Sequence, residues 1–182
     1  MNDIHMPPLK ILVLRTAAIG DVLVAASILP ELYRKYNQPD IDFYTQSPEL
    51  LRGNPYIHDV LIRMPDRQKY DEVLDLDMAY ESHPQLSIQQ AYAARAGISD
   101  SKLILELRIP ENLSAKVEKV LSDEKVTPGK KLVAIQSASG FWTRNMPLGF
   151  LKQIVERMET HGQFRFLLFG APHDPCIHGT HD

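Results

Sequence analysis

The order of apolar and polar positions divides the chain into short strand-like runs separated by helical stretches. The first run, residues 10–15 (KILVLR), has an unbroken apolar centre, which is typical of a strand buried on both faces of a parallel sheet. Residues 21–36 then place apolar side chains at helical spacing, and Pro30 within them predicts a kink or a break. A buried strand followed by an amphipathic helix indicates the first unit of an α/β fold.

The same alternation continues along most of the chain. Further strands are predicted at residues 40–45, 58–64, 70–77, 102–109, 131–139 and 164–170, and helices at 47–55 (short), 87–98, 110–124 and 148–162. Strands and helices that alternate in this way predict an α/β fold with a doubly wound parallel sheet.

A turn-rich, basic segment at residues 126–131 (VTPGKK) predicts a boundary between two such units. Residues 10–36 and 131–161 share one design, an apolar strand followed by a small polar loop and a helix. We therefore predict a disordered lead at 1–9, a Rossmann-like N-terminal domain at 10–125, and a linker with an incomplete second domain at 126–182. We expect the second domain to be incomplete because no strand or helix pattern follows residue 170.

Composition narrows the class of protein. The 182 residues are 44% hydrophobic and 24% charged with a net charge of −3, so no basic excess favours nucleic acid as a partner. The single cysteine, Cys176, forms no intrachain disulfide, which fits a reducing compartment. No signal peptide or apolar run of membrane-spanning length is visible, so we expect a cytoplasmic protein, with peripheral contact to the inner membrane left open.

The loop after the first strand ends in Gly-Asp at a predicted helix start. Ala17, Ala18 and Gly20 leave backbone N–H groups accessible there, an arrangement that attracts anions. Asp21 has two interpretations, a residue that caps the helix or favours its dipole, and a catalytic acid. Neither the dinucleotide fingerprint G-x-G-x-x-G nor a phosphate-binding G-x-x-x-x-G-K-[ST] motif is present.

The loop after residue 136 carries groups that suit a nucleotide diphosphate. Ser137, Ser139 and Thr143 supply hydroxyls, Gly140 lets backbone approach a ligand, and Arg144 can pair with a phosphate through two hydrogen bonds. An irregular polar turn with a surface arginine is the alternative interpretation.

Four stretches in order, residues 11–36, 70–77 (YDEVLDLD), 133–156 and 164–174, resemble glycosyltransferase family nine, the ADP-heptose:lipopolysaccharide heptosyltransferases and their relatives. The first looks like the N-terminal signature of that family, with a small-residue loop ending in Gly-Asp and a leucine-proline step in the helix. The resemblance implies a GT-B architecture, in which two Rossmann-like domains hold the acceptor and the nucleotide sugar respectively.

The resemblance also implies roles for single residues. The catalytic acid of the family falls on Asp21, as the general base that takes a proton from the acceptor hydroxyl. Its phosphate contacts fall on Ser139, Gly140, Thr143 and Arg144. The implied donor is a nucleotide-diphosphate sugar similar to ADP-heptose, and the implied acceptor is a saccharide or glycolipid of lipopolysaccharide biosynthesis. We expect no metal or other cofactor if cationic side chains and helix N-termini hold the diphosphate.

The sequence departs from the family in three ways. Gln136 stands where histidine is frequent, Met146 stands where tryptophan is frequent before the proline, and the later nucleotide-binding region is absent. We therefore expect a fragment, a truncated product, or a chain whose second domain is completed by another chain. A non-catalytic module that binds a sugar or a protein is the alternative function, and an unrelated flavodoxin-like regulatory domain is a third.

Two further clusters have chemical potential. The terminal segment contains Cys176 and three histidines, His173, His178 and His181, but its spacing matches no standard zinc module, so an unstructured terminus is expected. Asp75 and Asp77 could hold a divalent cation, although a solvated strand end is favoured, and Asp77 could instead contact the acceptor.

Overall fold

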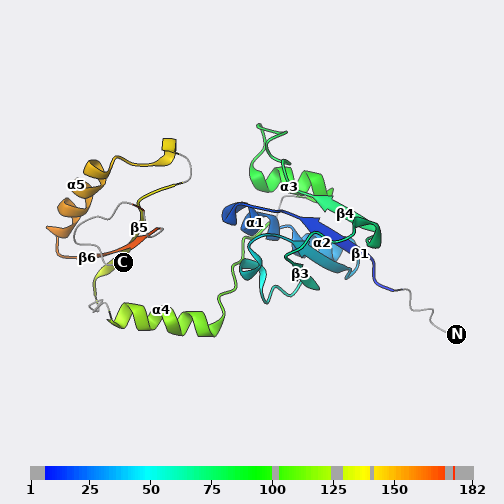
Figure 1. The fold of residues 1–182 in the computed structure, drawn as a ribbon, viewed down its shortest axis with the longest axis horizontal. Helices are drawn as coiled ribbons and strands as arrows, with labels where there is room; N and C mark the ends of the chain where they lie inside the picture. Colours follow the sequence, from blue (N-terminus) through cyan, green and yellow to red (C-terminus); the bar gives the residue numbers. More distant parts are fainter. Residues whose placement is uncertain (1–6, 100–102, 124–128, 140–141, 171–173, 175–182) are drawn as a thin grey trace. The chain divides into compact units, whose positions relative to one another are not determined.

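The computed structural model describes residues 7–99, 103–123, 129–139, 142–170 and 174 (Figure 1). The first unit of the chain is built on four short parallel strands. The strands are β1 (Lys10–Leu14), β2 (Asp40–Tyr44), β3 (Asp59–Leu61) and β4 (Glu72–Asp75), arranged in the order β3-β2-β1-β4. β1 pairs with β2 on one side and with β4 on the other. Because all strands run the same way, their carboxyl ends meet at one edge of the sheet.

The central strand is the most buried element. Ile11, Leu12, Val13 and Leu14 are at most 1% exposed, as expected for a continuous apolar run inside a parallel sheet. The core of this unit is formed by apolar side chains of the strands, α1, α2 and α3. The first strand predicted from the sequence is therefore confirmed, and it fixes the position of the loop that follows it.

The helix predicted at residues 21–36 is divided into α1 (Ile19–Ala26) and α2 (Leu29–Lys35). The break comes just before Pro30, which lies in the first turn of α2, where its missing N–H costs no intrahelical hydrogen bond. Helix α3 (Ile88–Ala96) begins at a capping box formed by Ser87 and Gln90. It ends at Gly97, whose φ of 60° is in the left-handed region.

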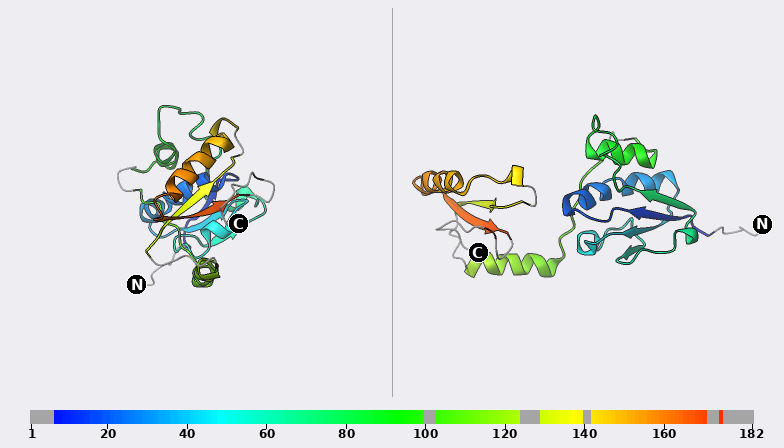
Figure 2. Two further views of the ribbon diagram at one scale, coloured as in Figure 1. Left: turned by 90° about the vertical axis from the view of Figure 1, so that its left-hand side faces the viewer. Right: turned by 45° about the horizontal axis from the view of Figure 1, so that its top comes forward.

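Two 3₁₀ turns complete the connections, η1 (Pro48–Leu51) after β2 and η2 (Arg67–Lys69) before β4. Helices α1 and α3 are neighbours, since Gln89 Nε2 donates a hydrogen bond of 3.3 Å to Ser27 Oγ. The first unit is therefore a small α/β layer structure whose loops at the carboxyl edge follow β1 and β4 (Figure 2).

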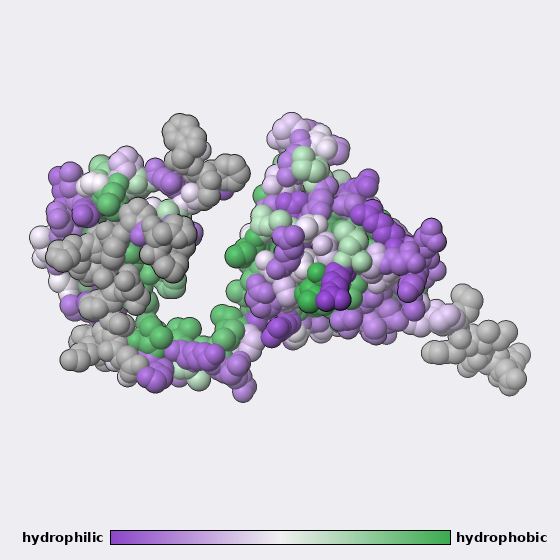
Figure 3. All heavy atoms as spheres, viewed as in Figure 1, coloured by the Kyte–Doolittle hydropathy of each residue, from purple (hydrophilic) through white to green (hydrophobic). Residues whose placement is uncertain are grey.

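The second unit begins with α4 (Glu111–Asp123) and contains β5 (Lys131–Gln136), η3 (Trp142–Arg144), α5 (Leu148–Glu159) and β6 (Phe164–Phe169). β5 and β6 are parallel, and α5 packs against their sheet through a small core of Leu151, Val155 and Phe166. Apolar side chains gather along one side of α4, where Leu113, Val117 and Val120 are about half exposed (Figure 3).

The sequence and the structure differ in two places. Contacts divide the chain between Ile109 and Pro110 and group α4 with the second unit, whereas the sequence places the boundary after residue 125. The prediction of a strand at residues 102–109 is wrong for the described part, 103–109, which forms no strand and joins neither sheet. Its alternating pattern suits a strand, but alternation alone supplies no partner strand.

The predicted lead at residues 1–9 lies mostly outside the described residues, as does most of the terminal segment with its histidines and cysteine. Within the lead, Leu9 packs against the core, and its carbonyl accepts a hydrogen bond of 2.9 Å from the backbone N–H of Asp40. The ordered part of the first unit therefore begins before β1.

Candidate functional site

The loop between β1 and α1 brings Asp21 to the carboxyl edge of the first sheet. The residue before α1, Ala18, has φ 67° and ψ 106°, a conformation that alanine rarely adopts and that costs on the order of 1–3 kcal/mol. The carbonyl of Ala18 nevertheless accepts the first helical hydrogen bond, from the N–H of Val22 at 3.0 Å. The loop thus starts the helix abruptly and places Asp21 in its first turn.

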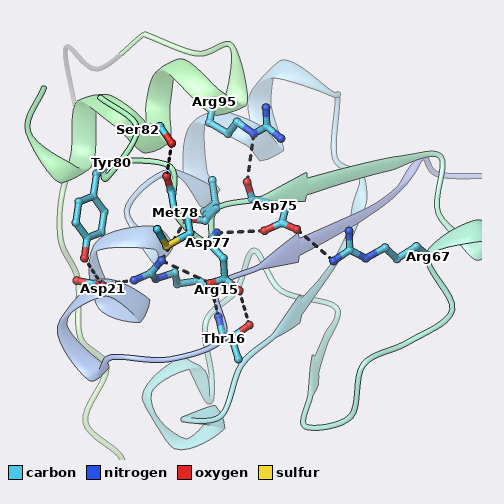
Figure 4. A network of polar contacts seen from close by, with 11 residues as sticks. Arg15, Thr16, Asp21, Arg67, Asp75, Asp77, Met78, Tyr80, Ser82 and Arg95 are labelled. Atoms are coloured by element: carbon cyan, nitrogen blue, oxygen red, sulfur yellow. Dashed lines mark hydrogen bonds and ion pairs between the residues drawn. The ribbon is translucent and has the colours of Figure 1, made fainter. Parts of the chain in front are cut away.

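The Asp21 carboxylate is engaged by two side chains from other parts of the chain. Arg15 Nη2 donates to Asp21 Oδ2, and Tyr80 Oη donates to the same oxygen at 3.0 Å. The N-cap position of α1 is occupied by Ala18, so Asp21 is not the N-cap residue, and its place in the first turn favours the helix dipole. The carboxylate contacts Arg15 and Tyr80 (Figure 4).

Arg15 links two acidic residues at this edge. Its side chain is 8% exposed, and it contacts the Asp21 carboxylate, Asp77 Oδ1 at 3.5 Å and the carbonyl of Leu76 at 3.3 Å. Burial acts to lower the pKa of the Arg15 guanidinium, but the neighbouring Tyr92 and Asp21 outweigh it and raise the pKa overall. Arg15 therefore stays a cation that joins the end of β1 to the end of β4.

Two tyrosine rings surround this cation. The guanidinium carbon of Arg15 lies 5.5 Å from the centre of the Tyr80 ring and 5.9 Å from that of Tyr92, within the range of cation–π attraction. Burial, followed by the hydrogen bond to Asp21, raises the pKa of the Tyr80 hydroxyl. The Tyr80 hydroxyl therefore keeps its proton at neutral pH and remains a hydrogen-bond donor to Asp21.

The end of β4 supplies the other half of the network. Asp77 accepts hydrogen bonds from the Thr16 backbone N–H at 2.9 Å and from Thr16 Oγ1 at 2.5 Å. Asp75 Oδ2 accepts from Arg67 Nη2 at 3.1 Å, and the carbonyl of Asp75 accepts from Arg95 Nε at 3.2 Å. Hydrogen bonds from Thr16 to the Asp77 carboxylate thus join the loop after β1 to the segment after β4.

A hollow of about 730 Å³ lies beside this network at the end of β4. Asp75 and Asp77 lie on its wall together with Arg95, and its other lining residues are Met78, Ala79, Ser82, His83, Ala91 and Ala94. Met78 has a φ of 59° and is 62% exposed, so a strained backbone residue stands at this hollow. A pocket at the carboxyl edge of a parallel sheet is the usual place for a ligand in α/β folds.

The residues predicted to bind a nucleotide sugar belong to the second unit. Ser137 follows β5 and is 8% exposed, and its hydroxyl has no hydrogen-bond partner among the described residues. The backbone N–H of Ser139 donates to Asn145 Oδ1 at 2.6 Å. Thr143 and Arg144 are exposed in η3, and Gly140 lies outside the described residues. The loop keeps polar groups accessible at the carboxyl end of β5.

The residues that hold Asp21 were not identified from the sequence. Arg15 offered one signal, a charged residue directly after four buried apolar ones. Tyr80 and Tyr92 offered none, since nothing in their local pattern relates them to a loop 59 or more positions earlier. Ala17 and Ala18 lie in the first loop as predicted, whereas Gly20 lies in the first turn of α1. Whether they bind an anion stays a prediction.

The part of the chain that the structure describes contains no cluster of three or more potential metal ligands. Asp75 and Asp77 bond to Arg67, Arg15 and Thr16. None of the described helices is both long and apolar enough to cross a bilayer.

Known proteins resemble this chain in structure. No protein-family model matches the sequence, and no curated protein matches it either. A glycosyl transferase family 9 protein from Veillonella parvula superposes with a TM-score of 0.73 at 14% identity, covering 94% of this chain and 65% of its own. The E. coli ADP-heptose lps heptosyltransferase II gives a TM-score of 0.62 at 14% identity, covering 90% and 65%.

A third structure, E. coli heptosyltransferase WaaC with ADP-2-deoxy-2-fluoro heptose, gives a TM-score of 0.54 at 14% identity and covers 91% of this chain and 70% of its own. The chain thus spans about two thirds of the length of these proteins. The α/β, GT-B-like fold and the resemblance to glycosyltransferase family nine are therefore confirmed at the level of the fold.

Proposed function

We propose that this chain carries the acceptor side, and part of the donor side, of a glycosyltransferase that uses a nucleotide-diphosphate sugar. The observation that carries the proposal is the Asp21 carboxylate, held at the carboxyl edge of the sheet by Arg15 and Tyr80. The fold shared with heptosyltransferases supports a sugar as the transferred group.

The proposed reaction needs a base beside an acceptor hydroxyl. Asp21 accepts the proton of that hydroxyl as its oxygen forms a bond to the anomeric carbon of the donor sugar. The bond from the anomeric carbon to the diphosphate breaks at the same time, and its electron pair leaves with the diphosphate. The Asp21 side chain is only 16% exposed, so few water molecules compete with the acceptor for it.

Arg15 and Tyr80 position this base. Both donate to Oδ2 of Asp21, and no hydrogen bond to Oδ1 is made within the described residues. The acceptor hydroxyl is proposed to bind at Oδ1, with the carboxylate orientation fixed by the two donors. A base held in one orientation brings reacting atoms together without further loss of freedom.

The hollow at the end of β4 is the proposed place of the acceptor. It shares Asp77 with the Asp21 network, and its carboxylate, guanidinium and imidazole groups can pair with the hydroxyls of a saccharide. A saccharide or glycolipid of the lipopolysaccharide type is the acceptor we propose, because the E. coli neighbour acts on lps by its name.

The second-unit loop is the proposed place of the donor diphosphate. Ser139, Gly140, Thr143 and Arg144 would contact its phosphates, and the unpartnered hydroxyl of Ser137 is a further donor. An ADP-heptose-like donor is proposed because structural neighbours were solved with ADP-D-beta-D-heptose and with a fluorinated ADP-heptose. Charge on the diphosphate is proposed to be met by these groups without a metal.

Asp21→Ala tests the role of the base. Loss of a general base should lower the rate of sugar transfer by about 100- to 10,000-fold. Glu31→Gln is the matched control, because Glu31 is also an acid in the first turn of a helix and also pairs with an arginine, Arg34. Transfer is measured as release of nucleoside diphosphate from ADP-, UDP- and GDP-sugars, with ADP-heptose first.

The outcomes separate the possible functions. Slow transfer by Asp21→Ala with normal transfer by Glu31→Gln supports the proposal. Equal transfer by wild type and Asp21→Ala contradicts the base assignment. If no nucleotide sugar of the panel binds or reacts with the wild-type protein, glycosyl transfer is ruled out and the non-catalytic binding module is favoured.

A further inference from the structure

A second hollow, of about 180 Å³, lies in the first unit and is independent of the proposed active site. Arg34 of α2, Arg52 after η1 and Arg108 of segment 103–109 all line it. Ala26, Leu50, Tyr56, Ile104 and Glu106 line it as well. It shares no residue with the Asp21 network or with the hollow at the end of β4.

The floor of this hollow is the outer surface of the core. Ala26 is buried, and Leu50 and Tyr56 are partly buried against the core cluster. The Tyr56 ring is fixed by an edge contact with the Tyr33 ring at 5.5 Å. The hollow therefore offers an apolar, preformed surface to the body of a ligand.

Three arginines from separate parts of the chain line this hollow. Ile104, Glu106 and Arg108, at every second position of segment 103–109, line it together. Arg34 already forms an ion pair with Glu31, but Arg52 and Arg108 form none within the part of the chain that is described. The chain as a whole has a net charge of −3, so two arginines without an ion pair beside one hollow make this part of the surface more positive than the average.

We propose that this hollow binds a phosphate group attached to a small apolar body. A phosphate can accept paired hydrogen bonds from the planar guanidinium groups of Arg52 and Arg108, and the apolar body would lie on Tyr56. The volume is enough for one phosphorylated group but below the range of a whole nucleotide or drug-sized pocket. Such a phosphate comes either from a soluble ester or from a phospholipid headgroup.

Phenyl phosphate is the probe, because it combines a phosphate with one small aromatic body. Its Kd is measured by NMR titration of the wild-type protein, and the backbone amides of residues 52–56 and 104–108 are expected to shift. Inorganic phosphate should bind more weakly, since it leaves the apolar floor empty. Binding should also weaken as salt is added, because the contacts are between charges near the surface.

Substitutions then test the arginines. The double variant Arg52→Gln/Arg108→Gln should raise the Kd for phenyl phosphate by at least about tenfold, since two charge-assisted contacts are lost. Arg157→Gln, which removes an exposed arginine of α5, is the control and should leave the Kd unchanged. Glu106→Gln should tighten binding, because it removes the single carboxylate among the lining residues.

Two results overturn the proposal. One is an equal Kd for wild type and the double variant, and the other is a set of amide shifts that excludes both segments. Cosedimentation with phosphatidylcholine vesicles containing phosphatidic acid then identifies the source. If the protein cosediments, if phenyl phosphate abolishes this and if the double variant does not cosediment, the source of the phosphate is a lipid headgroup. If phenyl phosphate binds but the protein does not cosediment, the source is a soluble ester.

Discussion

Two tyrosines that face each other beside Arg15 should respond in opposite ways to the same chemical change. Tyr80 and Tyr92 form an edge contact with ring centres 6.2 Å apart. The Tyr80 hydroxyl donates to Asp21 at 3.0 Å, whereas the Tyr92 hydroxyl is buried and has no partner among the described residues. Replacing each by phenylalanine removes one oxygen and leaves both rings in place.

The expected magnitudes follow from this difference. A buried hydroxyl without a partner costs about 1–3 kcal/mol, so Tyr92→Phe should raise the free energy of unfolding by up to that amount. A hydrogen bond to a charged group contributes about 1.5–3 kcal/mol, so Tyr80→Phe should lower it by a comparable amount. The cation–π contacts of Arg15 with both rings should survive, because phenylalanine keeps the ring face.

Native-state hydrogen exchange is the suitable assay, because it reports on the first unit alone. The amides of β1 are buried in that unit, and their protection at increasing urea gives its free energy of unfolding. A second readout is transfer activity, which Tyr80→Phe should reduce and Tyr92→Phe should leave nearly unchanged. If Tyr92→Phe destabilises the unit as much as Tyr80→Phe does, the hydroxyl of Tyr92 has a partner and the reasoning is refuted.

Two further predictions concern single contacts of the fold. Gly97→Ala should cost about 1–2 kcal/mol because φ there is 60°, whereas Gly149→Ala at the start of α5 should stabilise by up to about 1 kcal/mol. The hydrogen bond to Asp42 raises the pKa of His58 above 6.5, so this pair should stabilise the fold below pH 6.5 and lose that contribution as pH rises through the raised pKa.

Each of these has a direct measurement. Urea unfolding of the two glycine variants gives the two free-energy changes, and equal signs would contradict the assigned backbone conformation. For His58, NMR titration gives the pKa, and Asp42→Asn should return it toward its ordinary value. A free energy of unfolding whose pH dependence is the same in wild type and His58→Gln would exclude the proposed linkage.

Strand β1 and the helix break before Pro30 are predicted from the sequence because both have local causes. β1 has no polar position in its centre, and the break between α1 and α2 before Pro30 follows from the missing N–H of proline. Residues 103–109 have the same local pattern as a strand, but they have no partner strand in the structure. Strand pairing is a tertiary property, so a local pattern predicts it only where the sheet offers an open neighbour.

The candidate site shows the same limit more strongly. Asp21 is found from its loop, but its two partners are not, because Tyr80 comes 59 positions later in the chain. The order β3-β2-β1-β4 places β4 beside β1, and only this order brings Asp77 and Tyr80 to Arg15. A strained Ala18 and a strained Met78 stand in the two loops that meet there, and strain of that kind is invisible in the sequence.

The charge balance of this edge bears on which substrate it could hold. Arg15 pairs with Asp21 and Asp77, Arg67 pairs with Asp75, and Arg95 bonds the carbonyl of Asp75. Every arginine of the network already bonds an oxygen of the chain, so a diphosphate would find carboxylates there and no uncommitted cation. A polyol meets no such penalty, because its hydroxyls can donate to the carboxylates. The edge is therefore suited to an acceptor sugar and not to the diphosphate of the donor.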